Sequence, residues 1–444
     1  MGFKFSVIIP TLNEEYFLTR NLEQIISLRR NLEIIVTDGG STDNTLEIAK
    51  KFNCKIVESK AGRGTQLNAG AAVASGDILI FLHADTFLPY DAFELIEKTF
   101  SDYQVKIARF KLGFDFTSKW LEFYKRFTKY NSQFTRFGDS AIIVRKDFFK
   151  ELGGFSDRET FEDVDFFSRA VKLSDIFLID DFVVSSARRF ILDGEIKRQL
   201  LNILLFTAYL LNFNQNILSK MYSPPKKKRN NSLIIFLRYP ENGNVKTRLA
   251  KTTSSDFATS FYKTCAEKIV NEVKKIKSIN RFAFYSNKEE KTKVEKWLGS
   301  KLFFSPQEGK SLGERMQNAF AKVLSTGAKK VVIVGTDVPD LSAEIIREAF
   351  KKLDDSDIVI GPSKDGGYYL IGMKKMYPEL FSGIKFSTNT VFSETIGQIR
   401  TLGLSYYTLP ELQDIDTEED LIRWLNGSNE NSIKNEIKLA YETI

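Results

Sequence analysis

Short apolar runs alternate with longer amphipathic segments in the N-terminal part of the chain. The runs lie within residues 5–10, 33–37, 55–58 and 78–82, the third of which is a short strand pattern with only Ile56 and Val57 apolar, and the intervening segments have the apolar spacing of helices. The helix expected after the first run carries four apolar residues on one face: Leu18, Leu22, Ile25 and Ile26. Strands that alternate with helices predict an α/β fold with a mostly parallel central sheet.

The run over residues 78–82 is apolar without interruption, which is typical of a strand buried on both faces of a sheet. Polar residues begin directly after it, at His83 and Asp85. Because ligands of open α/β sheets bind outside the carboxyl ends of the strands, Asp85 is expected at a binding site. A carboxylate there can hold a divalent cation, which neutralises a nucleotide diphosphate. The alternative is an ordinary buried strand followed by a turn aspartate.

The same alternation begins again in the second half of the chain. Apolar runs cover residues 233–237 and 331–334, and the second of them leads to Asp337 as residues 78–82 lead to Asp85. The sequence therefore predicts two tandem α/β domains of one architecture rather than a single large sheet.

A polar segment separates the two alternations. Residues 223–231 contain two adjacent prolines and a run of lysine and arginine, but no apolar side chain. This composition is typical of a solvated linker. We therefore predict one domain over residues 1–222 and a second over residues 232–444.

The composition supports two folded domains in a reducing compartment. The 444 residues exceed one typical core, and a content of 43% hydrophobic and 13% aromatic residues argues against disorder. Two cysteines, Cys54 and Cys265, are too few for a disulfide framework or a zinc cluster. The chain begins directly with a strand pattern, so we expect no signal peptide and a cytoplasmic protein.

The charge and the longest apolar run bear on the partners. A net charge of +7 and a pI near 9.0 favour anionic ligands or a negatively charged membrane surface. Acidic residues are interspersed throughout, so nucleic acid is not an expected partner. Residues 200–211 form an apolar run shorter than the ~20 residues that span a bilayer. They predict a buried helix at a domain edge or, alternatively, a helix in peripheral contact with the inner face of a membrane.

Several motifs of the first half follow one another in a characteristic order. They are Pro-Thr-Leu-Asn-Glu at 10–14, Asp-Gly-Gly-Ser-Thr-Asp at 38–43, Asn-Ala-Gly at 68–70, His-Ala-Asp at 83–85, Gly-Asp at 138–139, Leu-Gly-Gly-Phe at 152–155, Glu-Asp-Val-Asp at 162–165 and Ser-Ala-Arg-Arg-Phe at 186–190. From residue 5 to about residue 222 the chain thereby resembles family-2 glycosyltransferases of GT-A fold. Within that family it is similar to the radical-SAM/selenodomain-associated transferase 2 type.

This resemblance implies transfer of a sugar from a nucleotide-sugar donor to an unknown acceptor, either a small molecule or a lipid-linked one. It implies a divalent cation, Mn²⁺ or Mg²⁺, at Asp85, the second acid of the family's Asp-X-Asp motif. His83 replaces the first acid and is the only histidine of the sequence, so it either contacts donor or metal or is structural. The other positions matched to donor binding are Pro10, Asn13, Glu14, Asp38, Arg63, Asn68, Arg188 and Arg189.

The resemblance also implies a catalytic role for Glu162 and Asp163. In inverting members such a carboxylate takes the proton of the acceptor hydroxyl, and we assign this role to Asp163. A solvated acidic helix start is the alternative, since acidic residues favour helix N-termini. Arg188 and Arg189 would pair with the leaving diphosphate or with an anionic acceptor.

A glycine-containing loop follows the first strand of the second half, at residues 238–249. Lys246 and Arg248 lie two residues apart in it, and such a loop can wrap a phosphate chain with backbone N–H groups and cations. Its spacing is not that of a Walker loop.

Five motifs of the second half belong together: residues 240–249, 311–316, 335–341, 365–369 and 414–417. Over residues 232 to about 426 they resemble the radical-SAM/selenodomain-associated transferase 1 group, which is GT-A-like and distantly related to nucleotidyltransferases. The resemblance implies phosphate binding by Lys246 and Arg248, metal binding by Asp337 and Asp416, and a pocket shaped by Asp365, Gly366 and Gly367. For Asp414 and Asp416, the alternative is a capped helix start at Asp-Thr-Glu-Glu-Asp, residues 416–420.

The sequence thus favours a bifunctional transferase, in which a glycosyltransferase is joined to a nucleotide- or nucleotide-sugar-dependent transferase. The alternative is one active glycosyltransferase domain with a non-catalytic second domain for binding or assembly.

Overall fold

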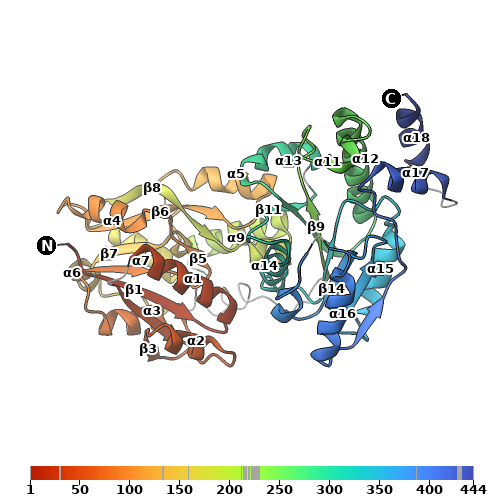
Figure 1. Ribbon diagram of the computed structural model, residues 1–444. Helices are drawn as coiled ribbons and strands as arrows, with labels where there is room; N and C mark the ends of the chain where they lie inside the picture. Colours follow the sequence, from red (N-terminus) through yellow and green to blue (C-terminus); the bar gives the residue numbers. More distant parts are fainter. Residues whose placement is uncertain are drawn as a thin grey trace. The chain divides into compact units, whose positions relative to one another are not determined.

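The chain forms two compact units, Met1–Lys227 and Lys228–Ile444, in the computed structural model (Figure 1). The structure describes residues 2–29, 32–132, 135–158, 160–211, 213, 218, 221, 231–299, 301–386, 388–427 and 433–443. Residues 223–230 of the predicted linker lie outside these ranges. Asn231, its last residue, is already the first residue of a strand.

The N-terminal unit is built on an eight-stranded sheet with the order β3-β2-β1-β4-β7-β6-β8-β5. The strands are β1 (Phe5–Thr11), β2 (Glu33–Asp38), β3 (Lys55–Glu58), β4 (Ile78–Phe81), β5 (Thr86–Phe87), β6 (Ile107–Phe114), β7 (Ile142–Arg145) and β8 (Ile176–Ser185). The helices are α1 (Glu15–Leu28), α2 (Thr45–Lys51), α3 (Arg63–Val73), α4 (Ala92–Phe100), α5 (Lys119–Phe127), η1 (Gly138–Ser140), α6 (Lys146–Glu151), α7 (Glu162–Ala170), α8 (Arg188–Asp193) and α9 (Glu195–Leu210). Strands β1 to β4 pair in parallel, and β7 is antiparallel to β4.

Strand β4 is buried on both faces, as its uninterrupted apolar run predicts. Ile78 and Ile80 pack in the same core cluster as residues of α1 and α4. Leu79 and Phe81 point to the opposite face, into a cluster with α3, α6 and α7. Helices on both faces of a mostly parallel sheet give the expected α/β architecture.

One detail of α1 differs from the prediction. Leu18, Leu22 and Ile25 are buried, but Ile26 is 37% exposed. The buried stripe turns instead through Asn21, whose amide donates a hydrogen bond to the carbonyl oxygen of Thr86. Asn21 can be buried because its amide has a hydrogen-bond partner, and a search for apolar residues alone does not identify such a buried polar position.

The C-terminal unit repeats this architecture on a seven-stranded sheet with the order β11-β10-β9-β12-β14-β13-β15. Its strands are β9 (Asn231–Leu237), β10 (Ile279–Tyr285), β11 (Phe303–Pro306), β12 (Val331–Val334), β13 (Ile358–Pro362), β14 (Tyr368–Met373) and β15 (Tyr406–Thr408). Its helices are α11 (Thr247–Ala250), α12 (Ser255–Lys274), η2 (Lys288–Glu290), α13 (Lys291–Leu298), α14 (Leu312–Leu324), α15 (Ala343–Lys352), η3 (Pro378–Phe381), α16 (Val391–Thr401), α17 (Glu418–Asn426) and α18 (Lys434–Glu442). As in the first unit, four parallel strands are followed by an antiparallel one.

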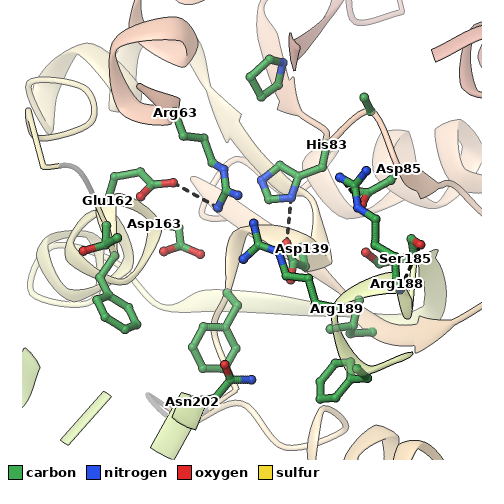
Figure 2. Close-up of a pocket in the computed structure, with 18 of the residues that line it drawn as sticks. Arg63, His83, Asp85, Asp139, Glu162, Asp163, Ser185, Arg188, Arg189 and Asn202 are labelled. Carbon is green, nitrogen blue, oxygen red and sulfur yellow. Dashed lines mark hydrogen bonds and ion pairs between the residues drawn. The ribbon is translucent and has the colours of Figure 1, made fainter. Parts of the chain in front are cut away.

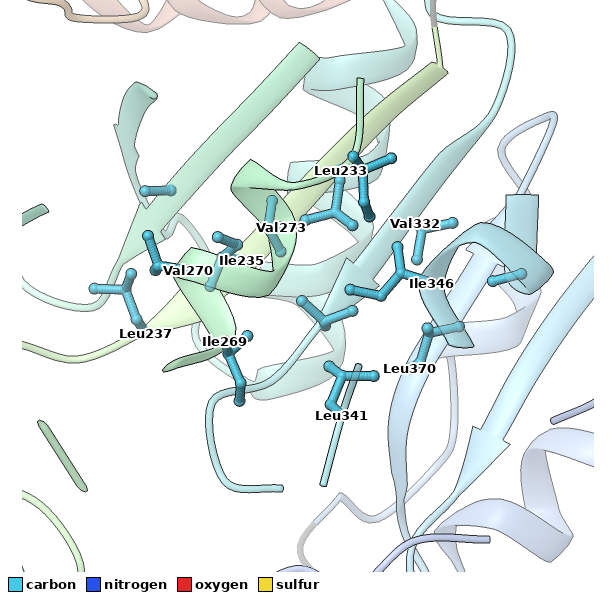
Figure 3. Packing of buried hydrophobic residues seen from close by; sticks show 14 of the residues in the cluster. Leu233, Ile235, Leu237, Ile269, Val270, Val273, Val332, Leu341, Ile346 and Leu370 are labelled. Carbon is cyan, nitrogen blue, oxygen red and sulfur yellow. The ribbon is translucent and has the colours of Figure 1, made fainter. Parts of the chain in front are cut away.

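The core of this second unit explains the apolar run at residues 233–237. Leu233, Ile235 and Leu237 of β9 belong to one buried cluster with side chains of α12 (Figure 3). Alternate strand residues thus bury one face of the sheet under the helix. The predicted pair of α/β units with mostly parallel sheets is confirmed.

The apolar run at residues 200–211 lies largely in α9 and is not simply buried. Leu205 and Phe206 are buried, whereas Leu200, Ile203 and Leu204 are exposed. Among the described helices none combines the length and apolar character needed to cross a membrane.

Candidate active site

A cavity of about 450 Å³ lies in the N-terminal unit, where β1, β4 and β8 end. Its volume is in the range of small-molecule sites, and the carboxyl ends of parallel strands are where such sites occur. In Figure 2, Glu162 and Asp163 lie on one side of the cavity and Asp85 and Arg188 on the other. Arg63, His83, Asp139 and Arg189 line the region between them, and Pro10 also contributes to the wall.

His83, which follows β4, is held by Asp139 of η1. The distance between His83 Nδ1 and Asp139 Oδ1 is 2.7 Å. Burial alone would raise the pKa of Asp139, but the hydrogen bond and charge of His83 outweigh it and hold this pKa well below its usual value. Because Nδ1 faces Asp139, Nε2 is the nitrogen of His83 left for a ligand in the cavity.

Arg188, at the start of α8, joins two of the predicted site acids. Its guanidinium donates two hydrogen bonds to Glu14, of 2.9 and 2.5 Å. Its Nη2 also lies 3.1 Å from Oδ2 of Asp85. Burial raises the pKa of Glu14 despite the hydrogen bond from Arg188. The structure therefore brings together three residues that the sequence places far apart, and it holds the guanidinium at the edge of the cavity.

The first turn of α7 carries the two predicted catalytic acids. Glu162 is only 2% exposed and pairs with Arg63, with 3.4 Å between Oε1 and Nη1. The alternative of a solvated acidic helix start is therefore wrong for Glu162.

Asp163 is oriented by the backbone. Its Oδ2 accepts a 2.5 Å hydrogen bond from the N–H of Gly138, and its Oδ1 accepts one of 2.8 Å from Val164. Burial, and next the charge of Glu162, raise the pKa of Asp163 to about 6. A carboxylate with such a pKa is ionised at neutral pH yet basic enough to accept a proton.

Three predicted donor residues have other contacts and do not line the cavity. Asp38 is buried and accepts hydrogen bonds from the backbone of Gly40 and Ser41 (2.8 and 2.7 Å). The side-chain amide of Asn68 donates from Nδ2 to the carbonyl oxygen of Phe155 (2.8 Å) and accepts at Oδ1 from the N–H of Phe155 (2.9 Å). Asn13 accepts from the N–H of Thr42 at 2.8 Å. The structure gives these residues a role in fixing loops, and their contact with a donor stays a prediction.

Sequence reasoning missed several residues that line the cavity. Asp139 stood in a recognised Gly-Asp motif but received no role. Tyr124 of α5 and Asn202 and Phe206 of α9 also line it. Asn202 and Phe206 both lie within the apolar run at residues 200–211. The polar side chain of Asn202 in this run is the signal that could have indicated which side of the helix faces the cavity.

Metal donors at this cavity are few. Within the described ranges, no three His, Cys, Asp or Glu side chains are grouped to hold a metal ion. The carboxylate of Asp85 and the imidazole of His83 are the donors that follow β4 in the cavity wall.

In the C-terminal unit, Lys246 lies between the two acids predicted to bind a metal. Its Nζ is 2.7 Å from Oδ1 of Asp337 and 3.4 Å from Oδ1 of Asp416, and Arg248 Nη1 is 3.3 Å from Oδ2 of Asp416. The capped helix start given as the alternative is present, because Thr417 caps α17 in a capping box with Asp420. Asp416 directly precedes this cap, and its carboxylate contacts Lys246 and Arg248 in addition. The four predicted residues thus form one cluster.

The predicted pocket loop of this unit is tightly constrained at a glycine. Gly366 has φ +87°, and a Cβ there would lie 2.1 Å from the carbonyl oxygen of Asn389, so only glycine fits. Asp365 accepts hydrogen bonds from Ser363 and from the N–H of Gly367 (2.6 and 2.8 Å). Burial, followed by the charge of Asp365, raises the pKa of nearby Asp414 to about 6.

Each of the two units contains a match to one protein family. Residues 6–152 match Glycosyl transferase family 2. The N-terminal unit contains a family-2 glycosyltransferase domain. Residues 269–388, in the C-terminal unit, match a family described as an uncharacterized protein conserved in bacteria (DUF2064).

Similar proteins agree with this identification. The chain is 34% identical over 112 residues to glycosyltransferase GlyA of Streptococcus pneumoniae. This match covers 24% of this chain and 16% of GlyA. It is 38% identical over 96 residues to a PGL/p-HBAD biosynthesis glycosyltransferase of Mycobacterium bovis, covering 20% of this chain and 37% of that protein. The chain therefore spans well under half the length of these curated relatives.

A solved structure from Desulfovibrio desulfuricans G20, named "putative nucleotide-diphospho-sugar transferase", is 30% identical. The match covers 49% of this chain and 96% of that one, with a TM-score of 0.47. The predicted family-2 glycosyltransferase domain and its α/β fold with a mostly parallel sheet are confirmed.

Proposed function

We propose that the N-terminal unit transfers a sugar from a nucleotide-sugar donor to an acceptor hydroxyl with inversion. The observation that carries this proposal is the partly buried carboxylate of Asp163, held by two backbone N–H groups and with its pKa raised to about 6, in the cavity of a family-2 glycosyltransferase domain. Asp163 accepts the hydroxyl proton while the acceptor oxygen bonds to the anomeric carbon. The bond from that carbon to the diphosphate breaks, and the nucleoside diphosphate carries away the negative charge.

Cationic side chains in the same cavity support the leaving-group half of this reaction. Arg63, Arg188 and Arg189 all line it. Arg188 is already oriented by Glu14 and Asp85, so a diphosphate meets a guanidinium that needs little reorganisation. The radical-SAM/selenodomain-associated transferase 2 type is the subgroup to which we assign this unit.

The residues after β4 fit a divalent cation, Mn²⁺ or Mg²⁺. Such ions are often held by one or two protein ligands together with phosphate oxygens and water, so a cluster of acids is not required. Asp85 supplies a carboxylate, and His83 presents Nε2 because Nδ1 is taken by Asp139. A bound cation would neutralise charge on the diphosphate.

For the C-terminal unit we propose a nucleotide- or nucleotide-sugar-dependent transfer at the cluster around Lys246. Two cations and two carboxylates from three separate segments meet there, which suits a phosphate chain with a metal ion. This makes the chain bifunctional, and we assign the unit to the radical-SAM/selenodomain-associated transferase 1 group.

A second candidate for this unit is binding or assembly without catalysis. It is favoured by the ion pairs of Lys246, which neutralise Asp337 and Asp416 in the chain alone. Incubating the chain with nucleotides, sugar phosphates and Mn²⁺ separates the two: a new product that persists in the Asp163→Asn variant means catalysis by the second unit.

The glycosyltransferase proposal is tested by a screen of nucleotide-sugars in thermal unfolding, with and without Mn²⁺. A donor found in this way is then used in a transfer assay, and the anomeric configuration of the product is read by NMR. We expect one nucleotide-sugar to stabilise the chain and the product to be inverted. A product of retained configuration would overturn the mechanism.

A further inference from the structure

Two neighbouring helices of the N-terminal unit have apolar side chains on both of their faces. Helix α5 buries Leu121, but Trp120, Phe123 and Phe127 point outward. The exposed residues are three and four positions apart, so they form one stripe on the helix. Their rings contact one another, with centroids 6.3 Å apart for Trp120 and Phe123 and 4.9 Å for Phe123 and Phe127.

Helix α9, which packs against α5, has an exposed apolar stripe of its own. Ile196, Leu200, Ile203 and Leu204 recur at helical spacing on its outer side. Together with Trp120, Phe123 and Phe127 of α5 they are called the docking face, and their exposed fractions lie between 47% and 62%. Single exposed apolar residues are ordinary, but seven on two adjacent helices indicate an interaction surface.

The two helices are joined, and their inner sides belong to the active-site cavity. Ser118, which caps α5, donates a hydrogen bond to Glu195 in the first turn of α9. Tyr124 of α5 and Asn202 and Phe206 of α9 line the cavity. On α9 the docking face and the cavity-lining residues are on opposite sides of the helix, and on α5 the cavity-lining Tyr124 lies next to the exposed stripe.

The charge around the docking face determines which partner it fits. Lys119, Arg126 and Lys129 are exposed on or just after α5, and Lys197 is exposed on α9. Arg198, in contrast, is buried and belongs to the interior. Basic side chains beside a Trp- and Leu-bearing face are the pattern of helices that lie in the interface of an anionic membrane.

We propose that the docking face binds the surface of an anionic lipid bilayer. The apolar side chains of α5 and α9 insert at the level of the headgroups, while the lysines and Arg126 contact lipid phosphates. If the unit is the glycosyltransferase proposed above, this arrangement presents the cavity to an acceptor carried by a lipid. The docking itself does not depend on that activity.

Vesicle flotation of the full chain tests this proposal, without donor or metal. We expect binding to mixed phosphatidylcholine–phosphatidylglycerol vesicles, little binding to phosphatidylcholine alone, and weakening at high salt because the charges are screened. The double variants Trp120→Ser/Phe123→Ser and Ile203→Ser/Leu204→Ser should each weaken binding by about tenfold or more, since each removes apolar area from the interface. Leu173→Ser, a 53% exposed leucine outside the face, is the matched control and should bind like the parent chain.

The outcomes separate docking from transferase activity. Thermal unfolding of each variant verifies its fold, and donor-induced stabilisation in the same samples reports on the proposed function alone. The proposal would be overturned if the parent chain did not bind anionic vesicles, or if both double variants bound them as well as the parent chain does. So would a chain that self-associates through the docking face, which sedimentation of the parent and the double variants would reveal.

Discussion

The backbone N–H of Gly138 donates a 2.5 Å hydrogen bond to Oδ2 of Asp163. A Cβ at residue 138 would lie only 3.2 Å from that oxygen, so a glycine allows this close approach. The N–H of Val164 holds the other oxygen of Asp163. The carboxylate is therefore aimed by the backbone rather than by mobile side chains, which is what a positioned proton acceptor requires.

Asp163→Asn should lower turnover by ~10²–10⁴-fold, because asparagine keeps the size of the side chain but cannot accept the proton. Donor affinity should stay nearly unchanged, since the substitution leaves the arginines of the cavity in place. Turnover is measured in a transfer assay and donor binding by calorimetry.

Glu162→Gln is the matched control for this experiment. Glu162 is buried and pairs with Arg63, so its loss should disturb the arginine and cost less turnover than Asp163→Asn. Equal losses in both variants would contradict the choice of Asp163 over Glu162 as the base.

The raised pKa of Asp163 predicts a pH profile. Its acid form cannot accept a proton, so kcat/KM should reach about half of its maximum near pH 6, level off at higher pH, and approach a fall of about tenfold per pH unit at lower pH. The charges of Glu162 and Asp139 raise the pKa of this carboxyl, and the charge of Arg63 lowers it. The profile should be measured over the range in which the chain stays folded, and a rate independent of pH between 5 and 7 would contradict the assignment (about one unit either side of the pKa).

Asp85→Asn should abolish turnover and remove the effect of Mn²⁺ on donor binding, because the amide is a weak ligand for such a cation. Loss of a cation at a diphosphate costs several kcal/mol of transition-state stabilisation. Glu14→Gln is the control, since it removes the other partner of Arg188 but keeps the carboxylate of Asp85. If the metal response survives in Asp85→Asn, Asp85 is not the ligand.

Local patterns in the sequence predict the strands and the position of the site. The strands predicted at residues 55–58 and 331–334 coincide with β3 and β12. The residues after β4 lie in the cavity, because a buried strand must deliver its following residues to the edge of the sheet. Position 83 has a histidine where the family pattern has an acid, but the sequence does not indicate that Asp139 is the partner of this histidine.

Contacts between distant segments could not be predicted. Arg188 and Glu14 are 174 residues apart in the sequence, and nothing local to either indicates their pairing. The pairing of His83 with Asp139 is likewise not indicated by the sequence near either residue. The hydrogen bond from the N–H of Gly40 to Asp38 depends on the conformation of the loop after β2, which the sequence pattern does not give. Propensity and periodicity determine which face of an element is buried, but the packing of whole elements determines which charges meet.

The two units should fold independently. Each has its own sheet and its own buried core, and domains with a separate core can fold alone. We expect residues 1–222 and 231–444, expressed separately, to unfold cooperatively. The second fragment starts at Asn231 because this residue pairs with Ile279 in the sheet. Aggregation of either fragment in isolation would contradict independent folding.

Lys246→Met should destabilise the C-terminal unit and abolish its binding of nucleotide. The lysine side chain is 5% exposed, and its removal leaves the carboxylates of Asp337 and Asp416 facing each other without a cation. Hydrogen bonds to charged groups contribute about 1.5–3 kcal/mol, and the half-exposed carboxylates reduce the expected loss to about 1–2 kcal/mol.

The pH dependence of this loss has a definite sign. Burial alone would lower the pKa of Lys246, but Asp337 and then Asp416 outweigh it and raise this pKa above its ordinary value of 10.5. The stabilisation is therefore fully present below that value and is lost as pH rises through the higher, folded-state pKa. At neutral pH the parent and Lys246→Met should differ in thermal unfolding by the full amount. Arg248→Met, which removes a 67% exposed side chain of the same cluster, should change stability by less than about 1 kcal/mol while still weakening nucleotide binding. If Lys246→Met binds nucleotide like the parent chain, the cluster is a structural ion pair and not a phosphate site.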